Sequence, residues 1–304
     1  MTILHAGLAG DLRLATALDV ALGLQLNDLA SIRSTGAIQY RGTVNGTGSD
    51  TSTQRLAGLG QDHMASIAEA ATTADTALGD ASVDIAVVRN SLARSVSDTV
   101  IFTGLANDIN PLTIAAEMMT AYDGRFNDVV AAAVATAATN VGTTGVDMST
   151  DDFFDAKYTL QLSSVPGAYF CLLHPRQMAD LEESIRAETG TVQFMVATGE
   201  MLMAKGQGYQ GNWLGIDIFA SSDVSAAGGI REGGMWGPGA LAYKTGIVGA
   251  DSFIGSSAVV VQQGEVLVEI GRVLGAGHVK IAGDAHFGIS VIEQGRLVGI
   301  VTDQ

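Results

Sequence analysis

Residues 111–140 read PLTIAAEMMTAYDGRFNDVVAAAVATAATN, and the spacing of their apolar side chains decides the fold. Asn110 supplies a helix cap before Pro111, and Gly142 supplies a stop beyond the last periodic residue. The sequence therefore predicts one helix over 111–140, roughly 40 Å long, that acts as a spine for the rest of the chain. Its apolar or small residues recur at a helical period, at Leu112, Ala115, Ala116, Met119, Tyr122, Phe126, Val129, Val130, Ala133 and Ala137.

The composition is that of a folded protein with a large core. The chain has 304 residues, 47% of them hydrophobic and 16% charged, which is enough for one large or two modest domains. Its apolar runs are shorter than the roughly 18 residues of a membrane span, and Asp11, Arg13 and Asp19 interrupt the first of them. We therefore expect no membrane span, no signal peptide and a cytosolic protein. The single cysteine, Cys171, lies in the apolar run YFCLL, which predicts a buried thiol and excludes internal disulfides.

The charge balance is strongly acidic. The chain carries 32 Asp and Glu against 16 Lys and Arg, a formal net charge of −16, and no basic cluster interrupts this excess. Proteins that grip nucleic acid gather Lys and Arg, because neutralising phosphates supplies most of their affinity. The sequence therefore predicts that DNA near this protein is enclosed and is not bound in a sequence-specific way.

Two segments near the start have the character of extensions. Residues 10–33 carry leucines at a roughly helical spacing broken by Gly23, which predicts a kinked amphipathic arm that needs a partner. In residues 36–62, Ile38, Tyr40 and Val44 alternate with polar positions and the polar run NGTGSDTST follows. This pattern predicts a long β-hairpin with a polar tip. Its core is too thin to stand alone in water, and no other stretch stands out as its partner.

The stretches on either side of the spine alternate between strand and helix patterns. Before it, residues 83–88 alternate apolar and polar side chains as a half-buried strand does. After it, Ser149 or Thr150 caps a helix, residues 169–173 form an apolar strand ending at His174, and Gln177 opens the next helix. The apolar stripe expected on the first of these helices is Phe153, Phe154, Ala156, Tyr158, Leu160 and Leu162.

The last third of the chain is predicted to be mostly strand. Residues 213–221 alternate as one strand, and residues 234–243 form another with Pro238 inside it. From residue 265 onward, short apolar runs are separated by glycines, which is typical of antiparallel hairpins.

Taken in order, these stretches resemble the major capsid proteins of tailed bacteriophages of the Hong Kong 97 type. The matching features are the run Ala68, Glu69, Ala70 and Ala71 before a strand, the long helix, and the strand that ends at His174 and Pro175. The resemblance implies an α+β fold of the Hong Kong 97 type, in which the last strands return to the same sheet as residues 83–88. It divides the chain into an N-terminal arm (1–33), an extended β-hairpin loop (34–80), a peripheral domain (81–149) with the spine helix 111–140, an axial domain (150–264) and closing strands of the peripheral domain (265–304).

The same resemblance implies a structural protein and no enzyme. Copies of such a chain assemble as hexamers and pentamers into an icosahedral shell around the double-stranded DNA genome of a tailed phage. The expected partners are a portal protein and a decoration or scaffolding protein, and the expected location is the virion, after assembly in the host cytoplasm. No catalytic residue, cofactor or metal site is expected. Two alternatives stay open: an encapsulin-like nanocompartment shell of the same fold, and a soluble α+β enzyme.

One glycine pattern invites a cofactor interpretation. Gly206, Gly208 and Gly211 form G-x-G-x-x-G, the fingerprint of dinucleotide binding. That site requires a strand before the motif and a helix after it, whereas here a helical segment precedes it and a strand follows. A surface loop is therefore the expected state of these glycines.

The remaining chemical candidates are scattered along the chain. His174, His278 and His286 lack the spacing of metal ligands, so they are expected to be structural. Asp284 alternates with His286 on one strand face, but a catalytic pair also needs a cleft and a nucleophile. The methionines Met195, Met201 and Met203 are expected to be adaptable packing residues and not metal ligands.

Lysine positions bear on a further implication of the resemblance. In some relatives a lysine of the extended loop forms a covalent bond with an asparagine of a neighbouring subunit. Residues 36–80 contain Arg41 and Arg55 but no lysine. A guanidinium stays protonated and cannot act as the nucleophile, so we expect subunits to be held together without covalent bonds.

Overall fold

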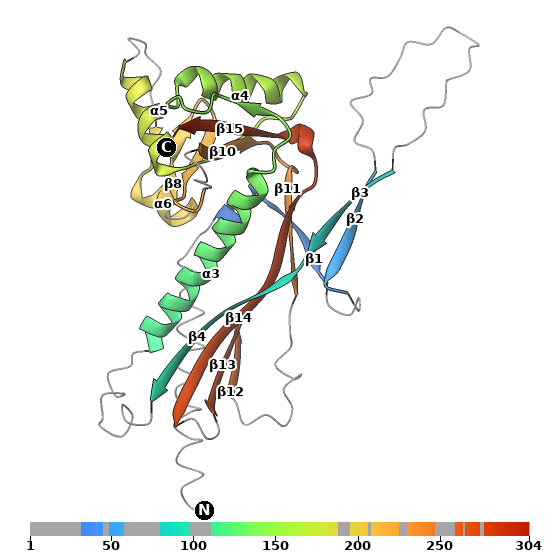
Figure 1. Ribbon diagram of the computed structural model, residues 1–304, viewed down its shortest axis with the longest axis vertical. Helices are drawn as coiled ribbons and strands as arrows, with labels where there is room; N and C mark the ends of the chain where they lie inside the picture. The colour runs from blue at the N-terminus through green and yellow to red at the C-terminus, as the bar shows by residue number, and fades with distance from the viewer. Residues whose placement is uncertain are drawn as a thin grey trace, which may run out of the picture.

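The molecule has a compact part and an elongated part, with the long helix α3 (Pro111–Val134) running between them (Figure 1). Of the expected N-terminal arm, only the last two residues are described, at the start of the 3-10 helix η1 (Ile32–Thr35). The rest of the arm lies outside the described residues. The computed structural model describes residues 32–44, 49–57, 80–97, 111–187, 195–205, 208–224, 230–246, 259–263, 265–273 and 277–303.

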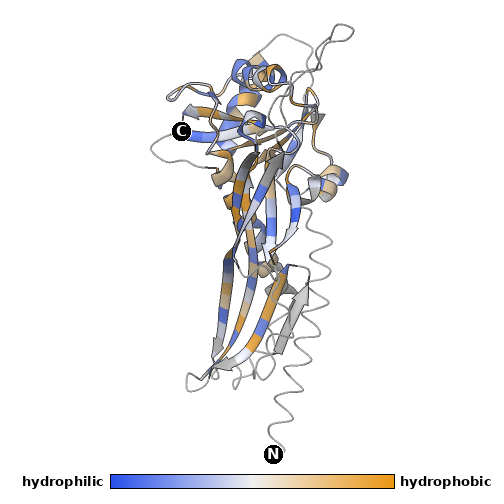
Figure 2. Cartoon of the chain, turned by 90° about the vertical axis from the view of Figure 1, so that its right-hand side faces the viewer, coloured by the Kyte–Doolittle hydropathy of each residue, from blue (hydrophilic) through white to orange (hydrophobic). Residues whose placement is uncertain are grey.

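A six-stranded sheet forms the elongated part. Its centre is β14 (His278–Val291), a strand of 14 residues that pairs antiparallel with β4, β13 and β11. β12 is added antiparallel to β13, and β1 is added parallel to β11. Apolar and polar residues alternate along the long strands, as expected for a sheet with one covered face (Figure 2). The other strands of this sheet are β1 (Gln39–Thr43), β4 (Val88–Ser97), β11 (Leu241–Gly246), β12 (Val259–Gln263) and β13 (Val266–Val273).

A seven-stranded mixed sheet, in the order β5-β15-β10-β6-β9-β8-β7, forms the compact part. Alternate residues of β6 enter two different cores: Phe170 and Leu172 join the core that contains α3, while Cys171 and Leu173 join the core under α4 and α5. Burial on both faces explains the uninterrupted apolar run of this strand. The strands are β5 (Asn140–Val141), β6 (Phe170–Leu173), β7 (Met195–Val196), β8 (Tyr209–Trp213), β9 (Ile216–Ala220), β10 (Ile230–Trp236) and β15 (Leu297–Asp303). The helices are α4 (Thr150–Leu162), α5 (Pro175–Ala187) and α6 (Gly199–Lys205).

Helix α3 packs against both sheets. The ring of Phe126 lies 5.6 Å from that of Tyr243 on β11 and 5.4 Å from that of Phe287 on β14. About two turns further on, Val134 packs against Gly234 of β10, where a Cβ atom would come within 2.5 Å of Val134 Cγ1. The predicted spine is confirmed, and Met119, Tyr122, Phe126 and Val130 of its stripe are buried.

The predicted end of the spine at residue 140 is wrong, because α3 ends at Val134. The chain then makes tight turns in which Thr136 and Ala137 donate backbone hydrogen bonds three residues back. The stop is imposed from outside the helix: Gln294 accepts a bond from Ala138 N at 3.0 Å and donates one to Thr136 O at 3.2 Å. The alanine-rich sequence contains no local signal for this stop.

The expected hairpin within residues 36–62 is also wrong. β1 pairs parallel with β11, whereas β2 (Thr51–Ala57) pairs antiparallel with β3 (Asp80–Ala86), so the two strands do not pair with each other. Ala37, Ile38 and Val44 are buried and contribute to the body of the protein. Alternation identifies a strand and the face it buries, but it carries no information about which strand lies beside it.

Two segments that were each predicted as a single strand contain parts of two strands. Residues 213–221 turn at Leu214 and Gly215, whose φ values of 54° and 80° make the tight left-handed turn between β8 and β9. Residues 234–243 contain the end of β10 in the compact sheet and the start of β11 in the long sheet. Pro238 lies between these two strands.

The strands do not separate at residue 264 as predicted. β11 and β12 lie in the long sheet with β13 and β14, whereas β15 lies in the compact sheet between β5 and β10. Residues 83–88 do not join the closing strands as one unit either, since β3 pairs with β2 and only β4 pairs with β14. The division into named peripheral and axial domains remains a prediction.

Besides the passage along α3, the chain crosses between the sheets at two connections that are hydrogen-bonded to each other. Gly237 N donates to Arg296 O at 3.0 Å, and Arg296 Nη1 donates to Pro238 O at 2.9 Å. Ile292 N donates to Ala240 O at 2.7 Å. The β10–β11 connection and the β14–β15 connection, which includes the 3-10 helix η5 (Gln294–Arg296), therefore form one joint between the two parts of the molecule.

Helix α5 begins two residues earlier than predicted, and its cap explains why. His174 Nδ1 accepts a hydrogen bond from Arg176 N at 3.0 Å, and the side chain of Gln177 accepts one from His174 N at 3.0 Å. This is a reciprocal capping arrangement with Pro175 as the first helical residue. Helix α4 starts with the predicted cap, Ser149, which forms a capping box with Asp152.

Candidate functional site

The G-x-G-x-x-G pattern has the order expected from the sequence, with α6 before it and β8 after it. Gly208 lies in a turn, but Gly211 lies within β8 and not in a surface loop, and Gly206 lies outside the described residues. A dinucleotide fingerprint needs the opposite order, because the pyrophosphate binds at the N-terminus of a following helix. The arrangement lacks that geometry.

The three histidines lie on separate elements. His174 caps α5, and burial, with the charge of Arg231 adding to it, lowers the pKa of its imidazole. His278 begins β14, while His286 lies further along the same strand. Within the residues that the structure describes, no group of three His, Cys, Asp or Glu side chains is placed to hold a metal ion.

Asp284 and His286 share a face of β14, but Asp284 is the partner of an arginine. Arg89 donates from Nε at 3.2 Å and from Nη2 at 2.6 Å to the buried carboxylate of Asp284. Burial raises the pKa of Asp284, but the hydrogen bonds and charge of Arg89 outweigh burial and leave it lowered. Burial also lowers the pKa of His286. The pair therefore has a structural partner that accounts for its position.

The sulfur-containing side chains are packing residues where the structure describes them. Cys171 is completely buried, and burial raises the pKa of its thiol, which stays protonated. Met201 is partly buried against the core that contains α3. The side chains of Met195 and Met203 lie outside the described set.

An apolar surface on α4 is the clearest candidate for a functional site. Phe154, Tyr158 and Leu162 recur every four residues and expose 40%, 58% and 65% of their surface. Leu214, in the turn between β8 and β9, exposes 37%, and its carbonyl oxygen accepts a bond from Lys157 Nζ at 3.2 Å. We call these four residues the α4 patch. Contiguous exposed apolar surface of this kind marks sites where proteins bind one another.

The sequence predicted these α4 residues as buried. Phe153, Ala156 and Leu160 are completely buried and face the core under the helix. Phe154 lies outside that core but packs against its edge, since the centroid of its ring lies 5.6 Å from that of Trp213. The six apolar residues of the predicted stripe thus cover two faces of the helix, which a single helical period did not separate.

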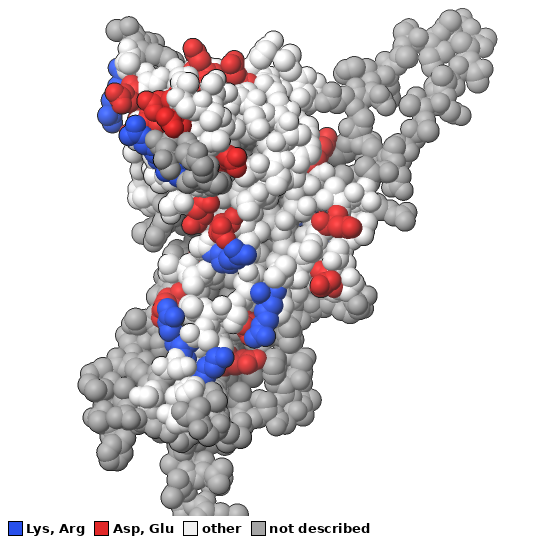
Figure 3. Space-filling model, viewed as in Figure 1, with Lys and Arg blue, Asp and Glu red and all other residues white. Residues whose placement is uncertain are grey.

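Charges are distributed unevenly over the surface. On the face in Figure 3, acidic side chains gather around the compact part, and the blue side chains of the elongated part lie beside red ones. Arg94 is paired with Glu117, and Arg125 with Asp128. These pairs leave little unbalanced positive charge for phosphate groups. Among the described residues, no helix has both the length and the apolar character to span a membrane.

Comparison with known proteins identifies the fold. No family model matches the chain, and no curated protein matches it. Its fold is similar to solved structures over most of both chains. A structure from Mycobacterium phage Che8 has 16% identity and a TM-score of 0.54, and covers 83% of this chain and 84% of its own. The capsid of cyanophage P-SCSP1u has 13% identity and a TM-score of 0.60, and covers 91% and 89%.

A third structure comes from a different kind of assembly. The SrpI encapsulin of Synechococcus elongatus PCC 7942 has 11% identity and a TM-score of 0.60, and covers 88% of this chain and 84% of its own. The chain has the Hong Kong 97-type fold. This confirms the predicted α+β class and the resemblance from which it came.

Proposed function

We propose that this chain is the major capsid protein of a tailed bacteriophage, which assembles into an icosahedral shell around a double-stranded DNA genome. The observation that carries the proposal is the Hong Kong 97-type fold, shared over 83% to 91% of the chain with structures from phages such as Che8 and P-SCSP1u. The role is structural and not enzymatic. The subunits act through the shape of the shell they build.

The charge balance supports an enclosing role. A net charge of −16 repels DNA at the scale of the whole subunit, so a packaged genome moves along the inner wall without adhering to it. The exposed arginines Arg94 and Arg125, being paired with acids, offer few contacts to phosphate. We therefore expect the chain to show no specificity for DNA sequence.

The partners follow from this proposal. Copies of the chain form hexamers and pentamers, a portal protein occupies one vertex, and a decoration or scaffolding protein adds to the shell. Assembly takes place in the host cytoplasm, and the mature location is the virion.

The α4 patch is the proposed contact between neighbouring subunits. It is the largest group of exposed apolar side chains on one described helix, and burying it against another copy would stabilise each subunit by mass action. Asp substituted at Tyr158 and Leu162 should leave the subunit folded, because both side chains point away from the core.

A second candidate function has its own observation. The encapsulin matches with the same TM-score, 0.60, as the cyanophage capsid. A nanocompartment shell that encloses a protein cargo is therefore the alternative.

Electron microscopy of the purified protein tests the proposal. Icosahedral shells that package DNA in the presence of the phage machinery would support it, shells that hold a protein cargo would support the alternative, and a protein that never forms shells would contradict both. The variant with Tyr158→Asp and Leu162→Asp should remain soluble with an unchanged circular dichroism spectrum and form no shells. Ala179→Asp, at an exposed position of α5 outside the α4 patch, is the control and should assemble normally.

A further inference from the structure

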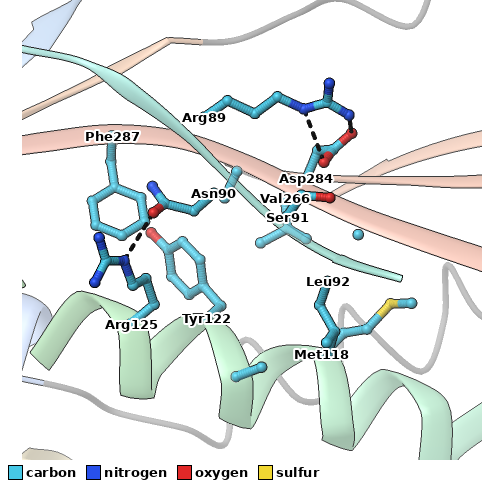
Figure 4. A pocket seen from close by; sticks show the side chains of 13 residues that line it. Arg89, Asn90, Ser91, Leu92, Met118, Tyr122, Arg125, Val266, Asp284 and Phe287 are labelled. Atoms are coloured by element: carbon cyan, nitrogen blue, oxygen red, sulfur yellow. Dashed lines mark hydrogen bonds and ion pairs between the residues drawn. The ribbon is translucent and has the colours of Figure 1, made fainter. Parts of the chain in front are cut away.

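A cleft lies between α3 and the long sheet, away from the α4 patch. Its volume is about 350 Å3, which is within the range of small-molecule sites in proteins. Figure 4 shows it bounded by α3 below and by β4 and β14 above. Its apolar lining comes from four elements, namely Leu92 of β4, Met118 and Ala121 of α3, Val266 of β13 and Phe287 of β14.

One guanidinium stands at the polar side of the cleft, that of Arg125 on α3. Arg125 donates one bond from Nε to Asn90 Oδ1 at 3.0 Å and one to Asp128. Arg89 also lines the cleft, but its guanidinium lies with Asp284 on the other face of β4 and β14 (Figure 4). A guanidinium carries five N–H groups. In the part of the chain that the structure describes, Arg125 therefore keeps further donors for an oxygen atom of a ligand.

The charges around the cleft decide what kind of ligand it favours. Arg125 is matched by the carboxylate of Asp128, and a second carboxylate, Glu265, accepts a bond from Tyr122 at 2.6 Å. The local charge is thus not positive, and an anion would give up its hydration without gaining an unpaired cation. An uncharged group that accepts hydrogen bonds gives up far less.

From this lining and charge balance, we propose that the cleft binds a small uncharged amphiphile. Its alkyl or aryl body lies on Met118, Ala121 and Val266, and its single acceptor oxygen, as in an alcohol, ether or amide, lies toward Arg125. This site is additional to the shell function and does not depend on it. Binding to the folded subunit alone would raise the midpoint of thermal unfolding.

The test uses the full-length purified subunit and three probes with the same alkyl chain: octan-1-ol, octanoate and octylammonium. Octan-1-ol should raise the unfolding temperature saturably, and the two ions should raise it less. Arg125→Met, which keeps the apolar stem and removes the donors, should weaken octan-1-ol binding roughly three- to tenfold, as expected for one hydrogen bond lost at a half-exposed site.

A matched pair of variants shows whether binding occurs in the cleft. Ala121→Trp fills it and should abolish the octan-1-ol effect, whereas Ala132→Trp, on an exposed position of the same helix, should not change it. Should Ala121→Trp fail to fold, the Arg125→Met titration decides alone. The proposal is overturned by an unsaturable octan-1-ol effect, by equal effects in the two tryptophan variants, by stronger binding of octanoate or octylammonium, or by unchanged affinity in Arg125→Met.

Discussion

At the scale of single residues, the tightest constraint lies where two strands cross. The carbonyl oxygen of Ala86, the last residue of β3, occupies the space that a Cβ atom on Gly288 would need, and the obstacle is backbone and not a movable side chain. Glycine is needed here for close approach and not for an unusual backbone conformation. The contact lets the chain pass from the β2–β3 ribbon into the long sheet.

Gly288→Ala should therefore lower the free energy of unfolding by about 1–3 kcal/mol or more, through overpacking against Ala86. Urea denaturation of the soluble subunit measures this. Gly295→Ala is the matched control, because a Cβ there meets nothing within 4 Å, and it should change stability by less than about 0.5 kcal/mol. Equal midpoints for the two variants would contradict the proposed crossing.

The cap of α5 makes stability depend on pH. Neutral His174 accepts a hydrogen bond from Arg176 N, and burial lowers the pKa of its imidazole below the ordinary value of about 6.5. As pH falls, the unfolded chain takes up the proton first, so the stabilisation present above about pH 6.5 is lost as pH falls through the lowered pKa. Thermal unfolding of the subunit between about pH 7.5 and about pH 5.5 should show this loss.

His174→Asn provides the comparison, since asparagine also caps helices but does not titrate. The variant should lose less stability than the parent protein over the same pH range. His286, whose pKa burial also lowers, is present in both proteins, so the difference between them isolates His174. Parallel pH profiles would rule out His174 as a titrating cap.

At the scale of elements, the end of α3 depends on one distant side chain. Gln294 bonds to Thr136 and Ala138, and these two hydrogen bonds fix the turn that leads from the helix into β5. β5 then pairs parallel with β15. The direction of the chain after the spine is therefore set by a residue close to the C-terminus.

Gln294→Ala should lower the free energy of unfolding by about 1–2 kcal/mol, because it removes both hydrogen bonds at an exposed site. Gln161→Ala, an exposed glutamine on α4, is the control and should change stability by less than about 0.5 kcal/mol. Chemical denaturation of both variants measures the difference. A Gln294 variant as stable as the control would show that the helix ends without help from this side chain.

The elements themselves were largely predictable from the sequence, but their partners were not. The period of residues 111–134 and the Ser149 cap identified α3 and α4 because both signals are local. The pairing of β1 with β11 joins residues about two hundred positions apart, and alternation carries no information at that distance. The cleft lined by α3, β4, β13 and β14 was missed for the same reason. The exposed residues of α4 were missed because one helical period did not separate the two faces of that helix.

At the scale of the whole molecule, the order of helices and strands could be recognised from the sequence. The points at which the chain passes from one sheet to the other could not. The resemblance to the Hong Kong 97-type fold rests on which element follows which, and the structural matches confirm that order. The chain crosses between the sheets after Trp236 and again after Val291, and the two crossings bond to each other. The joint between the two parts of the molecule consists of the β10–β11 and β14–β15 connections, which are far apart in the sequence. A single domain boundary at one residue number therefore cannot describe it.

The proposed shell should be held together without covalent bonds between subunits. No lysine precedes Lys157, so the loop over residues 36–80 offers no amine. Half-buried Lys157 donates to Leu214 O at 3.2 Å, Lys205 forms an ion pair with Asp217, and buried Lys244 donates to Ser52 Oγ at 2.6 Å. Exposed Lys280 is therefore the most accessible amine among the described residues.

Assembled particles, denatured with detergent and reductant, should therefore give a single band near 31.2 kDa on a gel. Particles treated with a bifunctional amine-reactive reagent serve as the positive control for a ladder of oligomers. A ladder from untreated particles would contradict the prediction. Its loss in Lys280→Arg would then identify the amine responsible, because arginine keeps the charge but remains protonated and cannot attack a neighbouring side chain.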